Sequence, residues 1–318
     1  MRKFILFTFI FLIILSGCNL NTSKKSAHHK NEKQTIKIGY LPITHSANLM
    51  MTKEIQQNAH RSNYNLELVR FNNWPDLMDA LNSGKIDGAS TLIELAMKSK
   101  QKGSDIKAVA LGHHEGNVVM AEKDKSIEDF HEHESYHFAI PHRYSTHYLL
   151  LDEMRKQLKL SPDTFSYHEM PPAEMPAALN EGSISGYSVA EPFGALGEKL
   201  GSGHTLLHGG DIIPDAYCCV LVLRSDLIHQ HQTVIQDFIS DYKKAGFEME
   251  NKDKSIEVMD KNFKQDKKVL SQSAEWTSYG NLAIDKQGYN KIKKLVDKQQ
   301  LFEAPTYSDF VDPTLYKE

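Results

Sequence analysis

The chain has 318 residues, of which 40% are hydrophobic and 25% charged, and its formal net charge is -4 at pH 7. These values exclude a mainly disordered chain, a collagen and a multi-span membrane protein, and the slight acidity excludes the basic surface that nucleic-acid binding requires. Three cysteines are too few for a disulfide scaffold, and the length predicts about two domains.

Residues 1–17 are typical of a secretory signal peptide. Arg2 and Lys3 precede an apolar run over 4–15, which is shorter than the roughly 20 residues of a membrane-spanning helix. The run ends in the sequence LSGC at Cys18, which resembles a lipobox, the signal after which a cysteine is lipidated. The polar stretch over 18–33 predicts a flexible tether. We therefore expect an extracytoplasmic protein that is anchored to the cell membrane through Cys18.

Strands and helices are expected to alternate over most of the remaining chain, because period-two and helical hydrophobic patterns follow each other. The first half predicts strand 35–40, helix 47–55, strand 66–71, helix 75–82, strand 86–90, helix 92–100 and strand 106–111. The second half predicts strand 137–140, helix 146–158, strand 165–168, helix 173–179, strand 185–189, helix 192–200 and strands 205–208 and 218–223. A helical stretch from 227 to about 301 and a wrap-around tail over 302–318 complete the chain. This alternation predicts mostly parallel sheets covered by helices.

Two similar phrases occur about one hundred residues apart. The sequence DALNSGKIDG over 79–88 is matched by AALNEGSISG over 177–186. Each phrase predicts a helix end, a glycine cap and a short strand. The repetition favours two α/β lobes built alike, although convergence on a common turn would give the same pattern.

Cys218 and Cys219 are adjacent within a strongly apolar strand pattern. A disulfide between neighbouring residues is strained, and a free cysteine in such a strand behaves as a small hydrophobe. The sequence therefore favours a packing role over a redox or metal-binding role for this pair.

Five segments, over 38–42, 74–88, 140–147, 170–176 and 189–193, together with the lipobox, make the chain resemble substrate-binding lipoproteins of ABC transporters. The group it resembles is the nitrate, sulfonate, taurine and bicarbonate class of periplasmic binding proteins, type II. The resemblance implies two doubly wound α/β lobes joined by two crossover segments, with the ligand cleft between them. Lobe one would hold 34–115 and 222–318, and lobe two 116–221. The crossovers would lie near 116–122 and 218–223.

Ligands in open α/β sheets bind beyond the carboxyl ends of the strands. Under this rule the candidate ligand-binding residues in the first half are Thr44, His45, Ser46, Trp74, Ser90, Thr91, His113 and His114. Those in the second half are Arg143, Ser145, Thr146, His147 and Glu191.

Several of these candidates suit an oxyanion. Ser46, Thr91 and Ser145 with Thr146 precede expected helices, whose N-termini attract anions, although plain helix caps would give the same residues. A guanidinium such as Arg143 binds an oxyanion with two hydrogen bonds, although a surface ion pair is equally expected. Glu191 disfavours an anion and is expected to cap its helix, to pair with a cation or to hold an ammonium group.

The favoured function is therefore capture of a small anionic solute, foremost an organic sulfonate or a nitrate- or taurine-like compound, and its delivery to an ABC permease and its ATPase. A nitrate-sized ion reaches only about -6 kcal/mol at about -1.5 kcal/mol per heavy atom, so tight binding favours a larger sulfonate. One alternative is a thiamine-related pyrimidine stacked on Trp74 or Tyr187. Another is a transition metal held by cleft histidines, although no tight ligand motif assigns metal residues.

The sequence contains no phosphate-binding glycine loop after the first strand, no Gly-x-Ser-x-Gly elbow and no prominent carboxylate pair. It therefore predicts a binding protein rather than an enzyme. No cofactor is expected, and the protein is expected to be a monomer. A sensory or adhesive lipoprotein built on the same lobes remains a further alternative.

Overall fold

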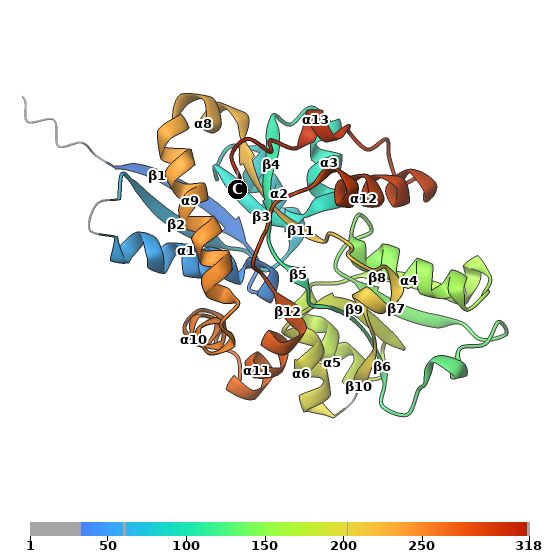
Figure 1. The fold of residues 1–318 in the computed structure, drawn as a ribbon. Coiled ribbons are helices and arrows are strands. Elements are labelled where there is room, and N and C mark those ends of the chain that lie inside the picture. The colour runs from blue at the N-terminus through green and yellow to red at the C-terminus, as the bar shows by residue number, and fades with distance from the viewer. Residues whose placement is uncertain (1–32, 60–61, 202, 317–318) are drawn as a thin grey trace, which may run out of the picture. The chain divides into compact units, whose positions relative to one another are not determined.

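The computed structural model describes residues 33–59, 62–201 and 203–316. The expected signal peptide and Cys18 lie outside these residues. Two five-stranded sheets form the framework, and each is flanked by helices (Figure 1). No helix among the described residues is long and apolar enough to cross a membrane.

The first sheet has the strand order β2-β1-β3-β11-β4. Its strands are β1 (Gln34–Tyr40), β2 (Tyr64–Arg70), β3 (Gly88–Leu92), β4 (Ile106–Leu111) and β11 (Cys219–Arg224). Strand β1 runs parallel to β2 and β3, whereas β11 lies antiparallel between β3 and β4. Because β11 runs the opposite way, its first residues lie at the carboxyl ends of β3 and β4.

The second sheet has the order β10-β6-β9-β7-β8. Its strands are β6 (Asn117–Glu122), β7 (Tyr136–Ile140), β8 (Phe165–Glu169), β9 (Gly186–Ala190) and β10 (Gly203–His208). Strand β7 is parallel to β8 and β9, and β6 is antiparallel to β9 and β10. The arrangement repeats that of the first sheet, with β7, β8, β9, β6 and β10 in the places of β1, β2, β3, β11 and β4.

The repeated phrases end at equivalent places in the two sheets. Gly88 opens β3 and Gly186 opens β9. A Cβ atom at Gly88 would lie 2.5 Å from the Val222 carbonyl oxygen, and one at Gly186 would lie 2.4 Å from the Met120 carbonyl oxygen. Each glycine thus lets the antiparallel strand approach closely. The prediction of two α/β halves built alike is confirmed.

The helices of the first half are α1 (Ala47–Asn58), α2 (Trp74–Asn82) and α3 (Ile93–Gln101). Those of the middle are α4 (Thr146–Gln157), α5 (Met175–Asn180), α6 (Phe193–Leu200) and α7 (Gly209–Ile212). Those of the last third are α8 (Ser225–Gln230), α9 (Gln232–Met249), α10 (Lys252–Phe263), α11 (Lys267–Trp276), α12 (Lys286–Lys298) and α13 (Tyr307–Phe310). Helix α9 packs on α1 of the first half, and α11 packs on α6 of the middle (Figure 1).

The stretch over 227–301 is helical as expected, but it divides into several helices, and one of the breaks between them contains a strand. Between α11 and α12 the chain forms β12 (Thr277–Ser278), which pairs with β5 (His114–Glu115), and then an irregular segment. Gly280 there has a φ of 66°, a left-handed value that ends helical winding. This strand pair brings the C-terminal part of the chain beside the residues that follow β4.

The expected segment 218–223 forms strand β11, as predicted, and the segment near 116–122 also forms a strand, β6. One strand boundary needs correction. The third strand runs to Leu92, two residues beyond its expected end, because pairing with β11 keeps Thr91 and Leu92 extended. Thr91 therefore lies inside the strand and does not precede the helix directly.

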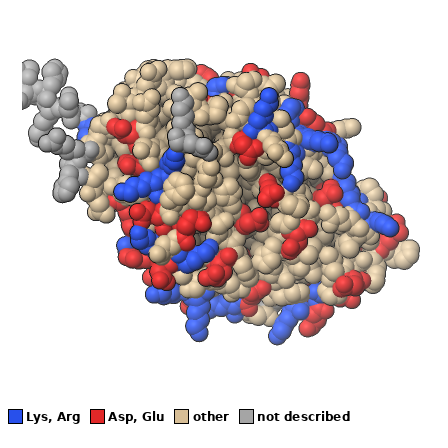
Figure 2. Space-filling view, viewed as in Figure 1, with Lys and Arg blue, Asp and Glu red and all other residues tan. Residues whose placement is uncertain are grey.

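On the face seen in Figure 2, acidic and basic side chains are interspersed.

Candidate functional site

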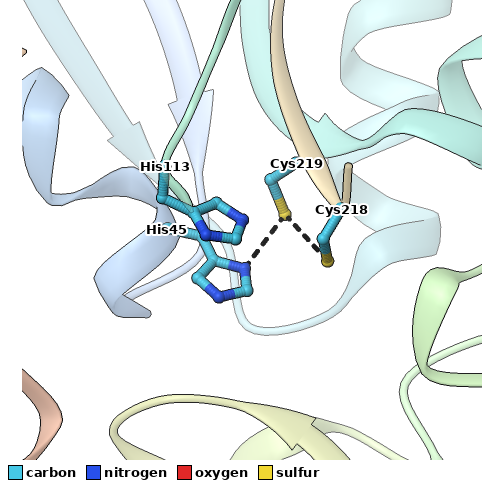
Figure 3. A group of neighbouring side chains, drawn as sticks. All are labelled: His45, His113, Cys218 and Cys219. Atoms are coloured by element: carbon cyan, nitrogen blue, oxygen red, sulfur yellow. Dashed lines mark hydrogen bonds between the residues drawn. The ribbon is translucent and has the colours of Figure 1, made fainter. Parts of the chain in front are cut away.

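Four buried side chains from the first sheet lie together at the carboxyl ends of its strands: His45, His113, Cys218 and Cys219 (Figure 3). His45 lies in the 3-10 turn Thr44–Ser46 after β1, and His113 follows β4. The cysteines stand at the start of β11 and come from the opposite side (Figure 3). One potential ligand atom from each residue lies within 4.8 Å of those of the others. We call these four residues the donor cluster.

The turn that carries His45 is held from several sides. The Thr44 amide donates to the Glu191 carbonyl over 2.8 Å, and the Tyr279 hydroxyl donates to the Thr44 carbonyl over 2.8 Å. The Ser46 hydroxyl points back to the Leu41 carbonyl at 2.5 Å. Because these bonds involve both sheets and the C-terminal segment, the position of His45 depends on the whole fold.

Each histidine of the cluster has one ring nitrogen tied to a backbone carbonyl. His45 Nε2 lies 3.2 Å from the Gly116 oxygen, and His113 Nδ1 lies 2.6 Å from the Glu115 oxygen. A carbonyl oxygen only accepts, so each of these nitrogens carries the proton. The other nitrogen of each ring, His45 Nδ1 and His113 Nε2, therefore keeps a lone pair for a ligand. This is the arrangement that metal-binding histidines use to fix their tautomer.

The thiols complete the donor set. Cys219 Sγ lies 3.4 Å from His45 Nδ1 and 3.9 Å from Cys218 Sγ. In a tetrahedral zinc site with ordinary bond lengths, sulfur and nitrogen ligands are about 3.6 Å apart and two sulfurs about 3.8 Å apart. These two spacings match the edges of such a tetrahedron.

Gly112 permits this geometry. A Cβ atom there would lie 2.4 Å from the His45 carbonyl oxygen and 3.5 Å from Cys219 Cβ. The Gly112 amide also donates to the Cys219 carbonyl over 2.9 Å. Only glycine lets the end of β4 pass between the turn after β1 and the start of β11.

A second set of buried polar groups adjoins the cluster. The rings of His45 and His147 are 6.5 Å apart and nearly parallel, and neither nitrogen of His147 has a hydrogen-bond partner among the described residues. The Thr146 hydroxyl lies 2.7 Å from Glu94 Oε1 and 2.8 Å from the Tyr217 carbonyl. Glu94 Oε2 is buried without a partner among the described residues. Since α4 follows β7 of the second sheet, His147 reaches the cluster from the other half of the molecule.

Burial sets the protonation of these groups. It lowers the pKa of His113 and of His147 to about 3, and it lowers the pKa of His45 well below its usual value, with the neighbouring His113 acting in the same direction. Burial raises the pKa of the Cys218 thiol, and it raises the pKa of Glu94 to about 7. The imidazoles are therefore neutral at physiological pH and their lone pairs are available.

An open groove of about 570 Å³ reaches the donor cluster at His113. The carboxylates of Glu115, Asp215 and Asp285 line the groove, together with the ammonium group of Lys291. Tyr217, which precedes Cys218, lies in its wall. The groove is therefore acidic where it approaches the cluster.

The other residues expected at the site have mixed positions. Thr44 and Ser46 hold the turn of His45, Ser90 and Thr91 are buried in β3, and the Thr91 hydroxyl points to the sulfur of Met78. Trp74 is the first residue of α2 and is 2% exposed, and its Nε1 has no partner among the described residues. His114 is half-buried, and its Nε2 lies 2.8 Å from the Asn281 carbonyl.

Three expected residues have structural contacts of their own. Arg143 is exposed, and its guanidinium lies over the Tyr148 ring. Ser145 caps α4 by accepting from the Tyr148 amide. The carboxylate of Glu191 accepts from the Ala195 amide near the start of α6, as expected for a cap, and also from the Ser273 hydroxyl over 2.7 Å.

Sequence reasoning missed both cysteines and Glu94 as site residues. The apolar pattern of β11 identified a strand but not its direction, and only the antiparallel direction puts the cysteines beside His45. Glu94 lies in the first turn of α3, three residues after Thr91, which was expected to cap this helix. In the sequence it resembles an ordinary exposed helix residue. The two adjacent cysteines at the beginning of the expected strand 218–223 were the available signal.

Comparison with known proteins identifies relatives of the chain. The NMT1-like family matches residues 29–260. A crystal structure of the ligand-binding component of an ABC-type import system from Staphylococcus aureus, with zinc bound, is 67% identical, covers 90% of this chain and 99% of its own, and has a TM-score of 0.89. The nitrate-binding protein NrtA from Synechocystis PCC 6803 is 18% identical with a TM-score of 0.78, over 90% of this chain and 88% of its own, and shares the fold.

Among curated sequences, the bicarbonate transport ATP-binding protein CmpC of Synechocystis is 26% identical over 64% of this chain. The match covers 33% of that protein, so the chain spans about a third of the length of this relative. The resemblance to periplasmic substrate-binding proteins and the α/β fold class expected from the sequence are confirmed by the family match and the solved structures.

Proposed function

This chain belongs to the NMT1-like family, and we propose that it is the solute-binding component of an ABC-type import system whose solute is a transition-metal cation of the zinc type. It would act by binding alone, without catalysis, and deliver the cation to a permease driven by an ATPase. The similarity to a zinc-bound import component supports both parts of this proposal.

The donor cluster is the observation that carries the choice of solute. Two neutral imidazoles and two thiols are the ligand types that zinc and its neighbours prefer. Both imidazole N–H groups are held by carbonyls, and one ligand atom from each of the four residues lies within 4.8 Å of those of the others. Metal binding requires the thiols to be deprotonated, and the charge of the cation would then compensate the two thiolates.

The same features argue against the organic sulfonate that the sequence favoured. A buried anion needs a cation or several donors, yet Arg143 is exposed and packs on Tyr148. The groove that reaches the cluster carries three carboxylates and one lysine. The sulfonate and the thiamine-related pyrimidine remain predictions that a ligand panel tests directly.

Ligands from both halves of the molecule would couple binding to closure. The four residues of the donor cluster lie in or next to strands of the first sheet, whereas His147 lies on α4, which follows β7 of the second. We propose that the two halves act as lobes, with the boundaries expected from the sequence, and that His147 draws the second lobe onto the bound cation. Replacing His147 would then destabilise the closed form more than it weakens binding of the cation to the donor cluster.

The test is titration of the metal-free protein with Co²⁺ and Zn²⁺. Cobalt bound by thiolates gives a strong near-ultraviolet charge-transfer band, which reports sulfur ligation without any transport assay. We expect one equivalent to bind, and Zn²⁺ at about 1,000 times its Kd to stabilise the protein by about 4 kcal/mol. The panel also contains nitrate, taurine, alkanesulfonates and a hydroxymethyl-pyrimidine.

Matched variants assign the ligands. The double variant C218S/C219S should lose the charge-transfer band, and H45A should bind at least tenfold more weakly. H168A changes an exposed histidine of β8 and should behave as the wild type. A wild-type protein that ignores both metals but is stabilised by a sulfonate would overturn the metal proposal and restore the sequence prediction.

Membrane attachment is a separate proposal. We propose that Cys18 is lipidated and tethers the protein outside the cytoplasm, because it ends the apolar run of an expected signal peptide. Cells fed a radiolabelled fatty acid should label the wild type and not the C18S variant. Equal labelling of the two would refute a lipid at this cysteine.

A further inference from the structure

The acidic groove beside the donor cluster has its own features, separate from the buried ligands. Glu115 and Asp215 are both exposed, and neither carboxylate has a hydrogen bond or an ion pair within the described part of the chain. Asp285 differs, since it accepts from the Tyr217 hydroxyl over 2.6 Å and from the Gly288 amide over 2.8 Å. The Lys291 ammonium donates to the Pro214 carbonyl. The groove thus presents two unpaired carboxylates to solvent.

One buried group connects this groove to the cluster. His113 lines the groove and is also a member of the donor cluster. Its side chain is nearly fully buried, with the residue 4% exposed, and its Nε2 has no partner among the described residues. A cation in the groove would therefore find its first nitrogen ligand at the inner end of the groove.

The backbone holds both carboxylates in place. Glu115 has a φ of 56° and Asp215 a φ of 53°, left-handed values that non-glycine residues seldom adopt. The Glu115 backbone is fixed there because β5 pairs with β12 and because the Glu115 carbonyl accepts a hydrogen bond from the His113 Nδ1–H group. The backbone of Glu115 is thus fixed at the edge of the groove, and the side chains of Glu115 and Asp215 both line it.

We propose that this groove is an outer site for the divalent cation, in which Glu115 and Asp215 hold the hydrated ion before His113 takes it into the donor cluster. The inference rests on the proposed metal-binding function and adds the route of capture. Carboxylate oxygens suit a hydrated cation, whereas the inner thiols and imidazoles suit a dehydrated one. The outer site would raise the rate of association and, at an unchanged rate of dissociation, the affinity by the same factor, without changing the ligands of the final complex.

The expected size of the effect follows from charge. A doubly charged ion about 6 Å from one carboxylate, in water at about 0.1 M salt, is attracted strongly enough to change its local concentration roughly threefold. Removing two carboxylates should therefore slow association roughly tenfold. The difference should shrink as salt rises, since screening removes the attraction.

The experiment is stopped-flow mixing of the metal-free full chain with Co²⁺, followed by the thiolate charge-transfer band. The test variant is E115Q/D215N, with E115Q alone as a milder second variant. The control E122Q/D124N removes the same charge from exposed residues at the end of β6 and just beyond it. We expect about tenfold slower association for the double variant at low salt, about threefold for E115Q, and wild-type rates for the control. Dissociation rates and stoichiometry should stay as in the wild type.

Three results would overturn the inference in distinguishable ways. If the wild type binds Co²⁺ and E115Q/D215N associates at the same rate and with the same salt dependence, the groove has no role and the donor cluster stands. If the wild type binds no metal, the proposed function fails and the outer site fails with it. Equal slowing in the control and the double variant would show an effect of net charge alone and would also refute the groove.

Discussion

Glu191 offers a test of how burial governs this fold. Burial raises its pKa from 4.5 to about 7, while the bonds from Ser273 and Ala195 act in the opposite direction. The folded protein therefore holds a proton on this carboxyl between about pH 4.5 and 7 that the unfolded chain has released. By linkage, the stability that this proton provides is present below pH 4.5 and is lost as pH rises through about 7.

The magnitude follows from the two pKa values. One pKa unit corresponds to about 1.4 kcal/mol, so the contribution of Glu191 to the free energy of unfolding should fall by about 2–3 kcal/mol between pH 5 and 8.5. Replacing Glu191 with Gln removes this titration and keeps an oxygen that accepts from Ser273 and Ala195. The drop in stability from pH 5 to 8.5 should therefore be about 2–3 kcal/mol smaller in E191Q than in the wild type.

Urea unfolding of the metal-free protein at the two pH values measures this difference. For each protein we take the difference between the free energies of unfolding at the two pH values. Comparing this difference between E191Q and the wild type cancels the contribution of every group that titrates alike in both proteins, including Glu94. The control E181Q changes an exposed glutamate and should keep the wild-type dependence. Parallel pH profiles for E191Q and the wild type would refute the argument that burial keeps this carboxyl protonated.

Three further variants test local features of the site. G112A should lose about 1–3 kcal/mol of stability and bind zinc more weakly, because the new methyl group meets the His45 carbonyl at 2.4 Å; urea unfolding and zinc titration report the two effects. S145A should lose about 1 kcal/mol with the cap of α4 and keep one bound metal, so a lost metal would contradict a purely structural role. R143A should leave the zinc titration unchanged, and a weaker response would place Arg143 in the site.

Much of the framework could be predicted because its signals are local. The alternating apolar pattern of β1 and the punctuation around α2 depend on neighbouring residues only. Ser145 is a helix cap in sequence and in structure for the same reason. The paired phrases ending at Gly88 and Gly186 indicated the repeat, because at both positions only a glycine allows the neighbouring antiparallel strand to approach closely.

His45 and His113 were expected at the carboxyl ends of the strands, but the cysteines of the donor cluster could not be predicted, because their placement depends on distant pairing. Cys219 meets His45 only through the antiparallel placement of β11 between β3 and β4, and no residue near the cysteines encodes that placement. The break after α11 was missed for a related reason. Thr277 and Ser278 leave the helical path to pair with β5, a partner more than 160 residues away in the chain.

The placement of β11 also governs when the protein can finish folding. Ser90 pairs with Leu221, so the first sheet stays open at its middle until the chain has been made past β11. Contacts of such long sequence separation form slowly, and the whole second sheet is built from residues between the two partners. A chain that ends before Cys218 contains both histidines of the donor cluster but neither of its thiols. Metal binding through sulfur would therefore show that the first sheet has been completed, in addition to showing that the metal is present.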